Sequence, residues 1–307
     1  MIYSFTITNN LGDSIKIELG KPEISGFLIT SIDGLGPVKA TINTTEIVTN
    51  DGSIFNSARL SQRNIVFQMA FVNTIYGESI EDIRHKSYKY FPVKKFIEIA
   101  IETDNRYIKT KGYVESNEPT IFSSMESAQI SIICPDPYLY SAGKNGKTIT
   151  NFHSIKPTFE FPFSNESLTE PLLKFSEIKN SVEGVVTYLG DIDVGAIIYI
   201  HAIGTASNIT IRNTRTKESM TIDTAKIEKL TGQGIVYGDD IIIDTIKGEK
   251  SITLIREGVL YNILNCLDKN TDWFTLTKGD NIFLFTAESG ESNLQFRIEN
   301  QIVYEGV

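Results

Sequence analysis

A short proline-rich segment just before the middle of the chain constrains its architecture most. The segment reads Cys134-Pro135-Asp136-Pro137-Tyr138. Each proline fixes its own φ angle and disfavours helical backbone in the residue before it. The apolar run 128–133 ahead of the segment predicts a strand, and the polar run 141–147 behind it is typical of a linker. We therefore interpret residues 134–138 as an interdomain hinge.

The length of the chain also favours two domains. Its 307 residues exceed what a single hydrophobic core usually organises. The composition, with 41% hydrophobic and 22% charged residues, is that of an ordinary globular protein. We predict that residues 1–140 form an N-terminal domain and that residues 141–307 form a C-terminal domain.

Charge and composition argue against several function classes. A net charge of −9 disfavours nucleic-acid binding, because neutralising phosphates requires clustered Lys and Arg. No apolar run approaches the ~20 residues that span a bilayer, so we expect no membrane insertion. Residues 1–6 alternate like a strand and do not resemble a signal peptide. The two cysteines, Cys134 and Cys266, lie in different halves without companion ligands, which indicates a reduced, cytoplasmic origin and neither a disulfide framework nor a zinc site.

The first half predicts an antiparallel sheet with one helix. Apolar and polar residues alternate over 3–7 and 15–19 with turn formers between them, which predicts an opening hairpin. Residues 38–56 are polar and β-branched without helical spacing, which predicts a long exposed hairpin or loop. Residues 63–71 predict a buried strand. Apolar positions at helical spacing predict a helix over 78–90.

The second half predicts a β-sandwich. From about residue 158 onwards, short strand-like segments follow one another at regular spacing, separated by Gly, Asn or Asp turns. The alternating aromatic residues at 159–163 belong to this pattern. Within 273–285 we expect two strands joined by a tight turn at 278–280. The whole chain is therefore predicted to be mainly β, an antiparallel β domain with one helix followed by a β-sandwich.

No catalytic or cofactor motif emerges from the sequence. The three histidines, His85, His153 and His201, lie far apart and have no motif spacing. A nucleophile elbow, a phosphate loop and a zinc-protease motif are all missing. A carboxylate pair for glycoside hydrolysis would meet only in space, and nothing singles out such a pair. We expect no catalytic residue, no cofactor and no enzyme activity.

Two acidic pairs and the single tryptophan are the remaining candidates for a site. Asp191 with Asp193, and Asp239 with Asp240, lie beside glycine turns, but a calcium loop needs more oxygen ligands at defined spacing. We therefore expect no metal. Trp273 is a candidate glycan contact, because such a ring could stack on sugar. The alternative is that Trp273 closes one end of the sandwich core.

Three features together resemble the distal tail protein family of long-tailed, non-contractile bacteriophages. The first is the hinge sequence at 134–141. The second is the ending Trp273-Phe274-Thr275-Leu276, followed by Gly279-Asp280-Asn281 and by Phe283 and Phe285. The third is the order of parts, a β-rich half with one helix, then a hinge, then a sandwich. The resemblance covers essentially the whole chain.

The resemblance implies a structural role. In that family the first domain forms a hexameric ring at the tip of the tail tube, and the second is a galectin-like β-sandwich outside the ring. The ring joins the tail tube protein to a tail-associated hub or lysin protein, and often to receptor-binding proteins at its side. The protein would then be made in the host cytoplasm and reside at the virion tail tip. An acidic chain fits a lumen that DNA passes without sticking.

Two further function classes stay open beside this one. A glycan-binding module would use the C-terminal sandwich and Trp273 to contact host cell-wall sugars. An enzyme acting on those sugars would need convergent carboxylates in a cleft. For the tail role, we expect ring assembly through edge strands and exposed hairpins of residues 1–134, since antiparallel edges can continue across subunits.

Overall fold

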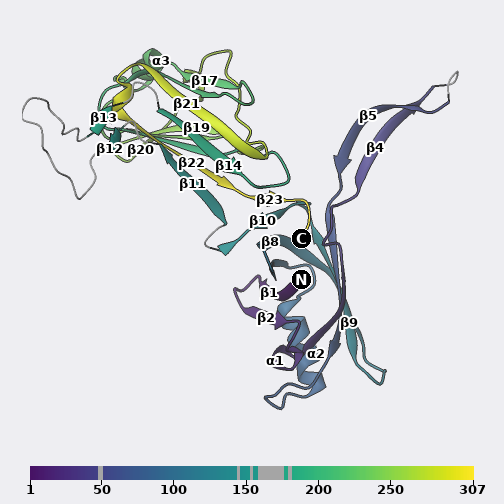
Figure 1. Cartoon of the computed structure of the whole chain (residues 1–307). Coiled ribbons are helices and arrows are strands. Elements are labelled where there is room, and N and C mark those ends of the chain that lie inside the picture. The colour runs from purple at the N-terminus through teal and green to yellow at the C-terminus, as the bar shows by residue number, and fades with distance from the viewer. Residues whose placement is uncertain (48–50, 144–145, 153–154, 158–175, 179–181) are drawn as a thin grey trace, which may run out of the picture. The chain divides into compact units, whose positions relative to one another are not determined.

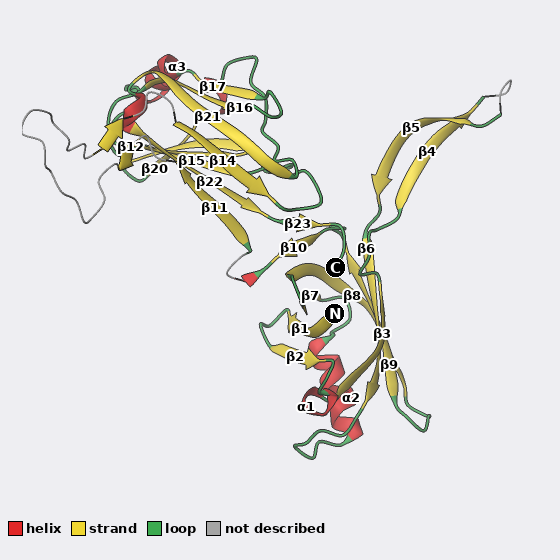
Figure 2. Ribbon diagram, in the orientation of Figure 1, coloured by secondary structure: helices red, strands yellow, loops and turns green. Residues whose placement is uncertain are grey.

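The computed structural model describes residues 1–47, 51–143, 146–152, 155–157, 176–178 and 182–307 (Figure 1). It consists mainly of antiparallel strands with a few short helices, as Figure 2 shows by colour. This confirms the predicted mainly β fold class. The chain forms two compact units, Met1–Gly146 together with Val303–Val307 (unit 1) and Lys147–Ile302 (unit 2).

Unit 1 is built on one antiparallel sheet with the strand order β2-β1-β7-β8-β9-β6-β3. Its strands are β1 (Ile2–Asn9), β2 (Ser14–Glu18), β3 (Phe27–Asp33), β6 (Arg63–Phe71), β7 (Phe96–Thr103), β8 (Tyr107–Thr120) and β9 (Ser127–Cys134). Two short strands join it beside β8, namely β10 (Leu139–Ser141) and β23 (Val303–Tyr304). The β1–β2 pairing confirms the predicted opening hairpin.

A separate two-stranded ribbon is inserted between β3 and β6. It consists of β4 (Ala40–Glu46) and β5 (Ser53–Leu60), which pair only with each other. Figures 1 and 2 show this ribbon projecting from the sheet of unit 1. The hairpin predicted for 38–56 is therefore present, and its second strand, β5, continues to Leu60.

Helix α2 (Ile80–Tyr90) confirms the helix predicted over 78–90, and the shorter α1 (Pro22–Ser25) precedes β3. A capping box starts α2: Asp82 N donates to Ser79 Oγ at 3.2 Å, and Ser79 N donates to Asp82 Oδ2 at 3.1 Å. The hydrogen bonds from Ser79 lower the pKa of the Asp82 carboxyl. None of the helices described here has the length and apolarity that crossing a membrane would require.

One face of the unit 1 sheet forms the core, and α2 packs on that face. Alternation along β1 and β6 buries Phe5 and Phe67, whose ring centroids lie 5.4 Å apart. Ile83 is the apolar residue of α2 that is fully buried there. The opposite face is polar, and Gln68 donates to Gln129 across β6 and β9 at 3.3 Å.

Unit 2 is a β-sandwich of two antiparallel sheets. The six-stranded sheet has the order β11-β22-β15-β18-β19-β20, and the four-stranded sheet has the order β14-β21-β16-β17. The first contains β11 (Lys147–Phe152), β15 (Ile197–Ala202), β18 (Asp240–Asp244), β19 (Ser251–Arg256), β20 (Val259–Asn262) and β22 (Leu294–Gln301). The second contains β14 (Val182–Tyr188), β16 (Ser207–Asn213), β17 (Ser219–Ile222) and β21 (Gly279–Ser289). A further pair is β12 (Ile155–Pro157) with β13 (Ser176–Ile178).

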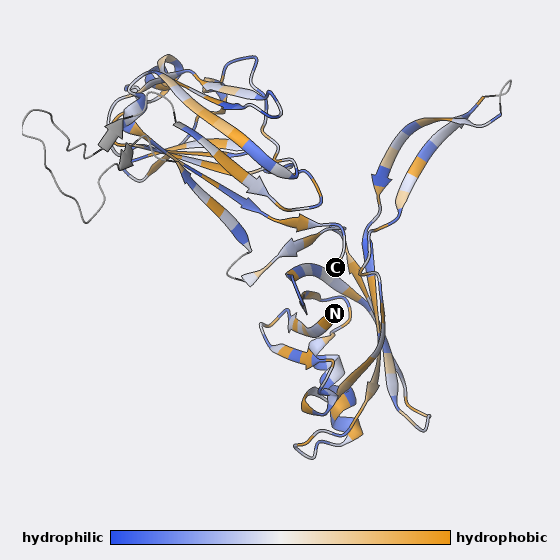
Figure 3. Ribbon diagram, viewed as in Figure 1, coloured by the Kyte–Doolittle hydropathy of each residue, from blue (hydrophilic) through white to orange (hydrophobic). Residues whose placement is uncertain are grey.

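The core of unit 2 lies between its two sheets. Phe285 on β21 stacks on Phe296 on β22 with ring centroids 4.1 Å apart. Figure 3 colours the strands by hydropathy: along β22, apolar Leu294, Phe296 and Ile298 alternate with polar residues, which produces one buried and one exposed face. The aromatic residues at 159–163, which belong to the predicted pattern, lie outside the described residues.

One local prediction for unit 2 is wrong. Residues 273–278 do not form a strand; they make one isolated bridge, between Leu276 and Val194, before β21 begins at Gly279. The Asn281 side chain replaces ladder bonds here, accepting from Thr277 N at 3.0 Å and donating to Thr277 O at 2.8 Å. Helices were also missed: α3 (Thr224–Thr231), η2 (Leu264–Cys266) and η3 (Glu291–Asn293).

The division of the chain differs from the expected boundary between residues 140 and 141. Strand β10 pairs with β8 through Tyr140 and Lys109, so it belongs to unit 1. The end of the chain also returns to unit 1, because Leu139 pairs with Tyr304. A two-residue strand such as β23 has no periodicity, which is why the sequence assigned 303–307 to the second domain.

Candidate functional site

The predicted hinge, residues 134–138, forms a fixed turn that leads from β9 into β10. Cys134 ends β9 and is buried. Asp136 Oδ1 accepts a hydrogen bond from Tyr138 N at 3.1 Å, and Asp136 Oδ2 accepts one from the Tyr140 hydroxyl. The turn therefore lies inside unit 1, and the division between the two units comes after Gly146.

A buried arginine at the start of β6 connects this turn to two other segments of unit 1. Only 1% of Arg63 is exposed. Its guanidinium donates to four backbone carbonyls: Pro137 O (2.8 Å), Gly34 O (2.5 Å), Gly36 O (2.7 Å) and Glu305 O (2.6 Å). We call this set of bonds the Arg63 anchor. It holds together the proline-rich turn, the base of the β4–β5 hairpin and the C-terminal segment.

The sequence did not single out Arg63. It is the first residue of a predicted strand. Its partners are backbone carbonyls far away in the chain, and every residue type has such a carbonyl, so the sequence does not reveal them. Burial lowers the pKa of Arg63. The guanidinium nevertheless keeps its charge, because arginine is not deprotonated in proteins. A buried charge is tolerated when it is hydrogen-bonded, and four of the five N–H donors of Arg63 have partners here.

Gly34 provides the close backbone approach that the Arg63 anchor needs. Its φ is +85°, and a Cβ there would lie 1.8 Å from Asn64 O. We expect Gly34→Ala to lower the free energy of unfolding of unit 1 by about 2 kcal/mol, because the new Cβ would clash with the backbone oxygen of Asn64. Gly52→Ala is the matched control, because Gly52 has φ +95° and open space around it. Urea titrations that give equal losses for both variants would contradict this account.

The β4–β5 hairpin exposes apolar side chains. Every residue of β4 is exposed, and so is every residue of β5 except Leu60. The exposed fractions of Ile42, Ile54 and Phe55 are 61%, 54% and 61%. Because Ile42 pairs with Ala58 and Phe55 with Thr44, the register places Ile42 and Phe55 on the same face of the ribbon. Exposed apolar residues on an isolated ribbon are typical of an interaction surface.

A second group of exposed apolar residues lies at the other end of β6 and β9. These side chains belong to the β6–α2 loop and the β8–β9 loop: Ile75 (65% exposed), Tyr76 (72%), Phe122 (101%) and Met125 (58%). The pairing of Ala70 with Ser127 places both loops at that end, whereas the pairing of Arg63 with Cys134 marks the hairpin end. Unit 1 therefore presents apolar side chains at two opposite ends.

The polar face of the unit 1 sheet contains a shallow hollow of about 570 Å³. Gln68, Gln129 and Thr30 are among the residues that line it. The lining includes one carboxylate, that of Glu118, and no Lys or Arg. Such a surface offers no cation to a phosphate group.

Both cysteines are buried as free thiols. Burial raises the pKa of Cys134 and of Cys266. Because the thiolate is the reactive form, we expect both thiols to react slowly with a disulfide reagent at pH ~8, at a rate set by unfolding. Denaturant should then release two reactive thiols. Rapid labelling of either cysteine in the folded chain would contradict this expectation.

Three of the four candidate aspartates each pair with a basic side chain. Asp239 binds Arg256 and Asp240 binds His201, while Asp191 binds Lys278 at 3.0 Å. Among the residues that the structure describes, no group of three or more His, Cys, Asp or Glu could hold a metal ion. His85 lies exposed on α2 in unit 1, and His153 lies outside the described residues.

Trp273, the candidate glycan contact, packs partly buried against the core of unit 2. Lys250 Nζ lies 5.1 Å from the centroid of its ring, so a cation already occupies a position over the indole. This geometry supports the alternative that Trp273 closes the core. A glycan contact by Trp273 stays a prediction.

Comparison with known proteins identifies the fold. No protein-family model matches the sequence. No curated protein sequence matches it either. Among solved structures, the crystal structure of the phage SPP1 Dit (gp 19.1) protein matches with a TM-score of 0.61 at 12% identity, covering 97% of this chain and 98% of that one. The chain has the fold of the SPP1 Dit protein.

This match confirms the resemblance to distal tail proteins at the level of the fold. The SPP1 protein is described as a paradigm of the hub adsorption apparatus in phages that infect Gram-positive bacteria. A chain of the phage P2 baseplate in its activated conformation with Ca covers 98% of this chain at 12% identity, with a TM-score of 0.44.

Proposed function

We propose that this chain is a structural distal tail protein of a long, non-contractile phage tail. It forms a hexameric ring that joins the tail tube to the tail-tip and receptor-binding components. The observation that carries this proposal is the match to the SPP1 Dit fold over 97% of the chain. The exposed apolar side chains at the two ends of unit 1 support it, because such groups are typical of surfaces that bind another protein.

The β4–β5 hairpin is the proposed contact between neighbouring copies. A ribbon without a core of its own is marginal in water, so burial of Ile42 and Phe55 against a second copy would stabilise it. The two ends of the main sheet path, β2 and β3, add edges at which strands could continue across copies. A contact between different surfaces of identical copies closes into a ring when the rotation allows.

The end of unit 1 that carries the β6–α2 and β8–β9 loops is the proposed contact along the tail axis. Ile75, Tyr76 and Phe122 form an apolar group there, well suited to a neighbouring tail protein above or below the ring. The partners in this proposal are the tail tube protein on one side and a tail-associated hub or lysin protein on the other. Receptor-binding proteins would attach at the outer side of the ring.

The polar face of the unit 1 sheet is the proposed lining of the lumen. Around its hollow the sheet carries neutral polar groups and Glu118, without a basic residue. DNA would pass this part of the face without electrostatic capture, since non-specific affinity comes from Lys and Arg at the phosphates. The net charge of −9 is consistent with this role.

The proposal assigns no reaction, cofactor or metal to this chain. Its place is the tail tip of the virion, after synthesis in the host cytoplasm. Electron micrographs of the purified full chain test the proposal: we expect rings with a central hole and sixfold symmetry. Compact particles without a hole, at every concentration used, would contradict it.

A further inference from the structure

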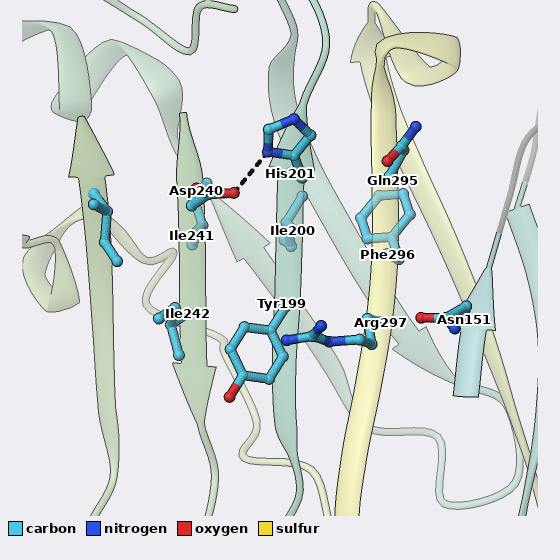
Figure 4. Close-up of a pocket in the computed structure, with 11 residues that line it drawn as sticks. Asn151, Tyr199, Ile200, His201, Asp240, Ile241, Ile242, Gln295, Phe296 and Arg297 are labelled. Carbon is cyan, nitrogen blue, oxygen red and sulfur yellow. Dashed lines mark hydrogen bonds and ion pairs between the residues drawn. The ribbon is translucent and has the colours of Figure 1, made fainter. Parts of the chain in front are cut away.

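The outer face of the six-stranded sheet in unit 2 carries a groove. The proposed structural role at the tail tip assigns no ligand to it. The groove has a volume of about 390 Å³ and crosses β22, β15 and β18 (Figure 4). Side chains alternate along a strand, so Tyr199 and His201 on β15 point to this outer face while Ile198 and Ile200 are buried on the inner one. The groove is therefore formed by side chains on a rigid sheet.

Strand register sorts the lining side chains into two rows across the sheet. The first row consists, strand by strand, of Asn151, Arg297, Tyr199 and Ile242. The second row consists of Gln295, His201, Asp240 and Ile255. Directly opposed Cβ atoms lie about 5 Å apart, so the two rows can present amides, an imidazole, a carboxylate and a phenol to one ligand.

The basic side chains of the groove already have acidic partners. His201 Nδ1 lies 2.7 Å from Asp240 Oδ1. Arg297 Nη2 lies 3.2 Å from Glu299 Oε1, and the same guanidinium stacks 4.2 Å from the centroid of the Tyr199 ring. Because Glu299 compensates the charge of Arg297 and the Asp240 carboxylate faces His201, the groove is better suited to a neutral ligand than to an anion.

Two other ligand classes fit the groove less well. A peptide that adds a strand needs an unpaired sheet edge, whereas β15 lies between β22 and β18, and β18 lies between β15 and β19. A divalent cation needs several oxygen or nitrogen ligands, and the described part of the chain offers no group of three suitable residues. The groove is better suited to a ligand that binds through hydrogen bonds to side chains alone.

We propose that this groove is a binding site for a neutral saccharide. Sugar hydroxyls donate and accept hydrogen bonds, as do the amides of Asn151 and Gln295 and the His201–Asp240 pair. Ile242 supplies an apolar surface for the C–H face of a sugar ring. The volume lies at the small end of ligand pockets, which fits a short oligosaccharide segment. Trp273 takes no part, because it does not line the groove.

Ligand-observed NMR on the full-length chain tests this inference. The probes are three neutral disaccharides, lactose, cellobiose and N,N′-diacetylchitobiose, each at millimolar concentration. We expect saturation transfer to at least one of them. His201→Ala and Gln295→Ala should each weaken that binding about tenfold, the effect of losing roughly 1.4 kcal/mol of hydrogen bonding. Both residues are on the outer face, so neither change opens the core.

His85→Ala is the matched control, because His85 is an exposed histidine on α2 of unit 1. Its binding should equal that of the unchanged chain. The proposal is overturned if no disaccharide shows saturation transfer, or if the double variant His201→Ala/Gln295→Ala binds as well as the unchanged chain. Ring formation is read out separately by micrographs, so a failure of the saccharide site leaves the assembly proposal untouched.

Discussion

Replacing residues 41–59 by a short Gly-Ser turn should abolish the proposed ring, giving monomers, and leave both units folded. The removed segment is the exposed part of the β4–β5 hairpin, which pairs only with itself. Its deletion therefore opens no core of unit 1. Light scattering should report a monomeric mass for the shortened chain, while circular dichroism should show a preserved thermal transition.

Point variants refine this prediction. Phe55→Ser should weaken ring assembly by about tenfold or more, because the buried area of one aromatic side chain is worth more than ~1.4 kcal/mol. Tyr237→Ser is the matched control, since Tyr237 is 78% exposed in unit 2 and lies outside the proposed contact. An unchanged ring in both the deletion and the Phe55 variant would rule out the hairpin as the contact between copies.

Replacing Arg63 by Met should lower the free energy of unfolding of unit 1 by about 4 kcal/mol. The change keeps much of the side-chain volume but leaves four backbone carbonyls without the donor that they share. A hydrogen bond to a charged group contributes about 1.5–3 kcal/mol, so losing four of them together outweighs the gain from no longer burying the charge. Hydrogen exchange read by mass spectrometry should show faster exchange in β23 and in the turn at 134–138.

Unit 2 provides an internal reference for this experiment. Trp273 is the only tryptophan and lies in unit 2, so its fluorescence follows the unfolding of that unit alone. The fluorescence midpoint in urea should not change in Arg63→Met. Arg59→Met, at an exposed position of β5, should change neither unit by more than ~0.5 kcal/mol. Unchanged exchange in β23 of the Arg63 variant would show that the anchor is dispensable.

Local patterns predicted much of the secondary structure. The spacing of apolar residues located α2, and Ser79 with Asp82 provides its capping box. The polar, β-branched composition of 38–56 indicated an exposed hairpin, because strands that bury neither face carry no apolar alternation. By contrast, α3 follows a strand directly and spans eight residues, too few for its spacing to stand out among short strands.

The sites depended on contacts that the sequence does not encode locally. The Arg63 anchor joins residues up to 242 positions apart through backbone carbonyls, which have no sequence signature. The groove of unit 2 assembles Asn151, His201 and Arg297 from three strands whose pairing is set by the sandwich topology. Trp273 and the proline-rich turn were candidates for a functional role because Trp and Pro are rare in this sequence. Their structural roles, however, depend on packing between distant segments.

The mass of the full-length chain in solution tests the central claim most directly. Multi-angle light scattering across a concentration series should reveal a species six times the 34.3 kDa of the single chain. That mass would support a ring built by this chain from its own surfaces. A mass of one chain throughout the series would contradict self-assembly through unit 1.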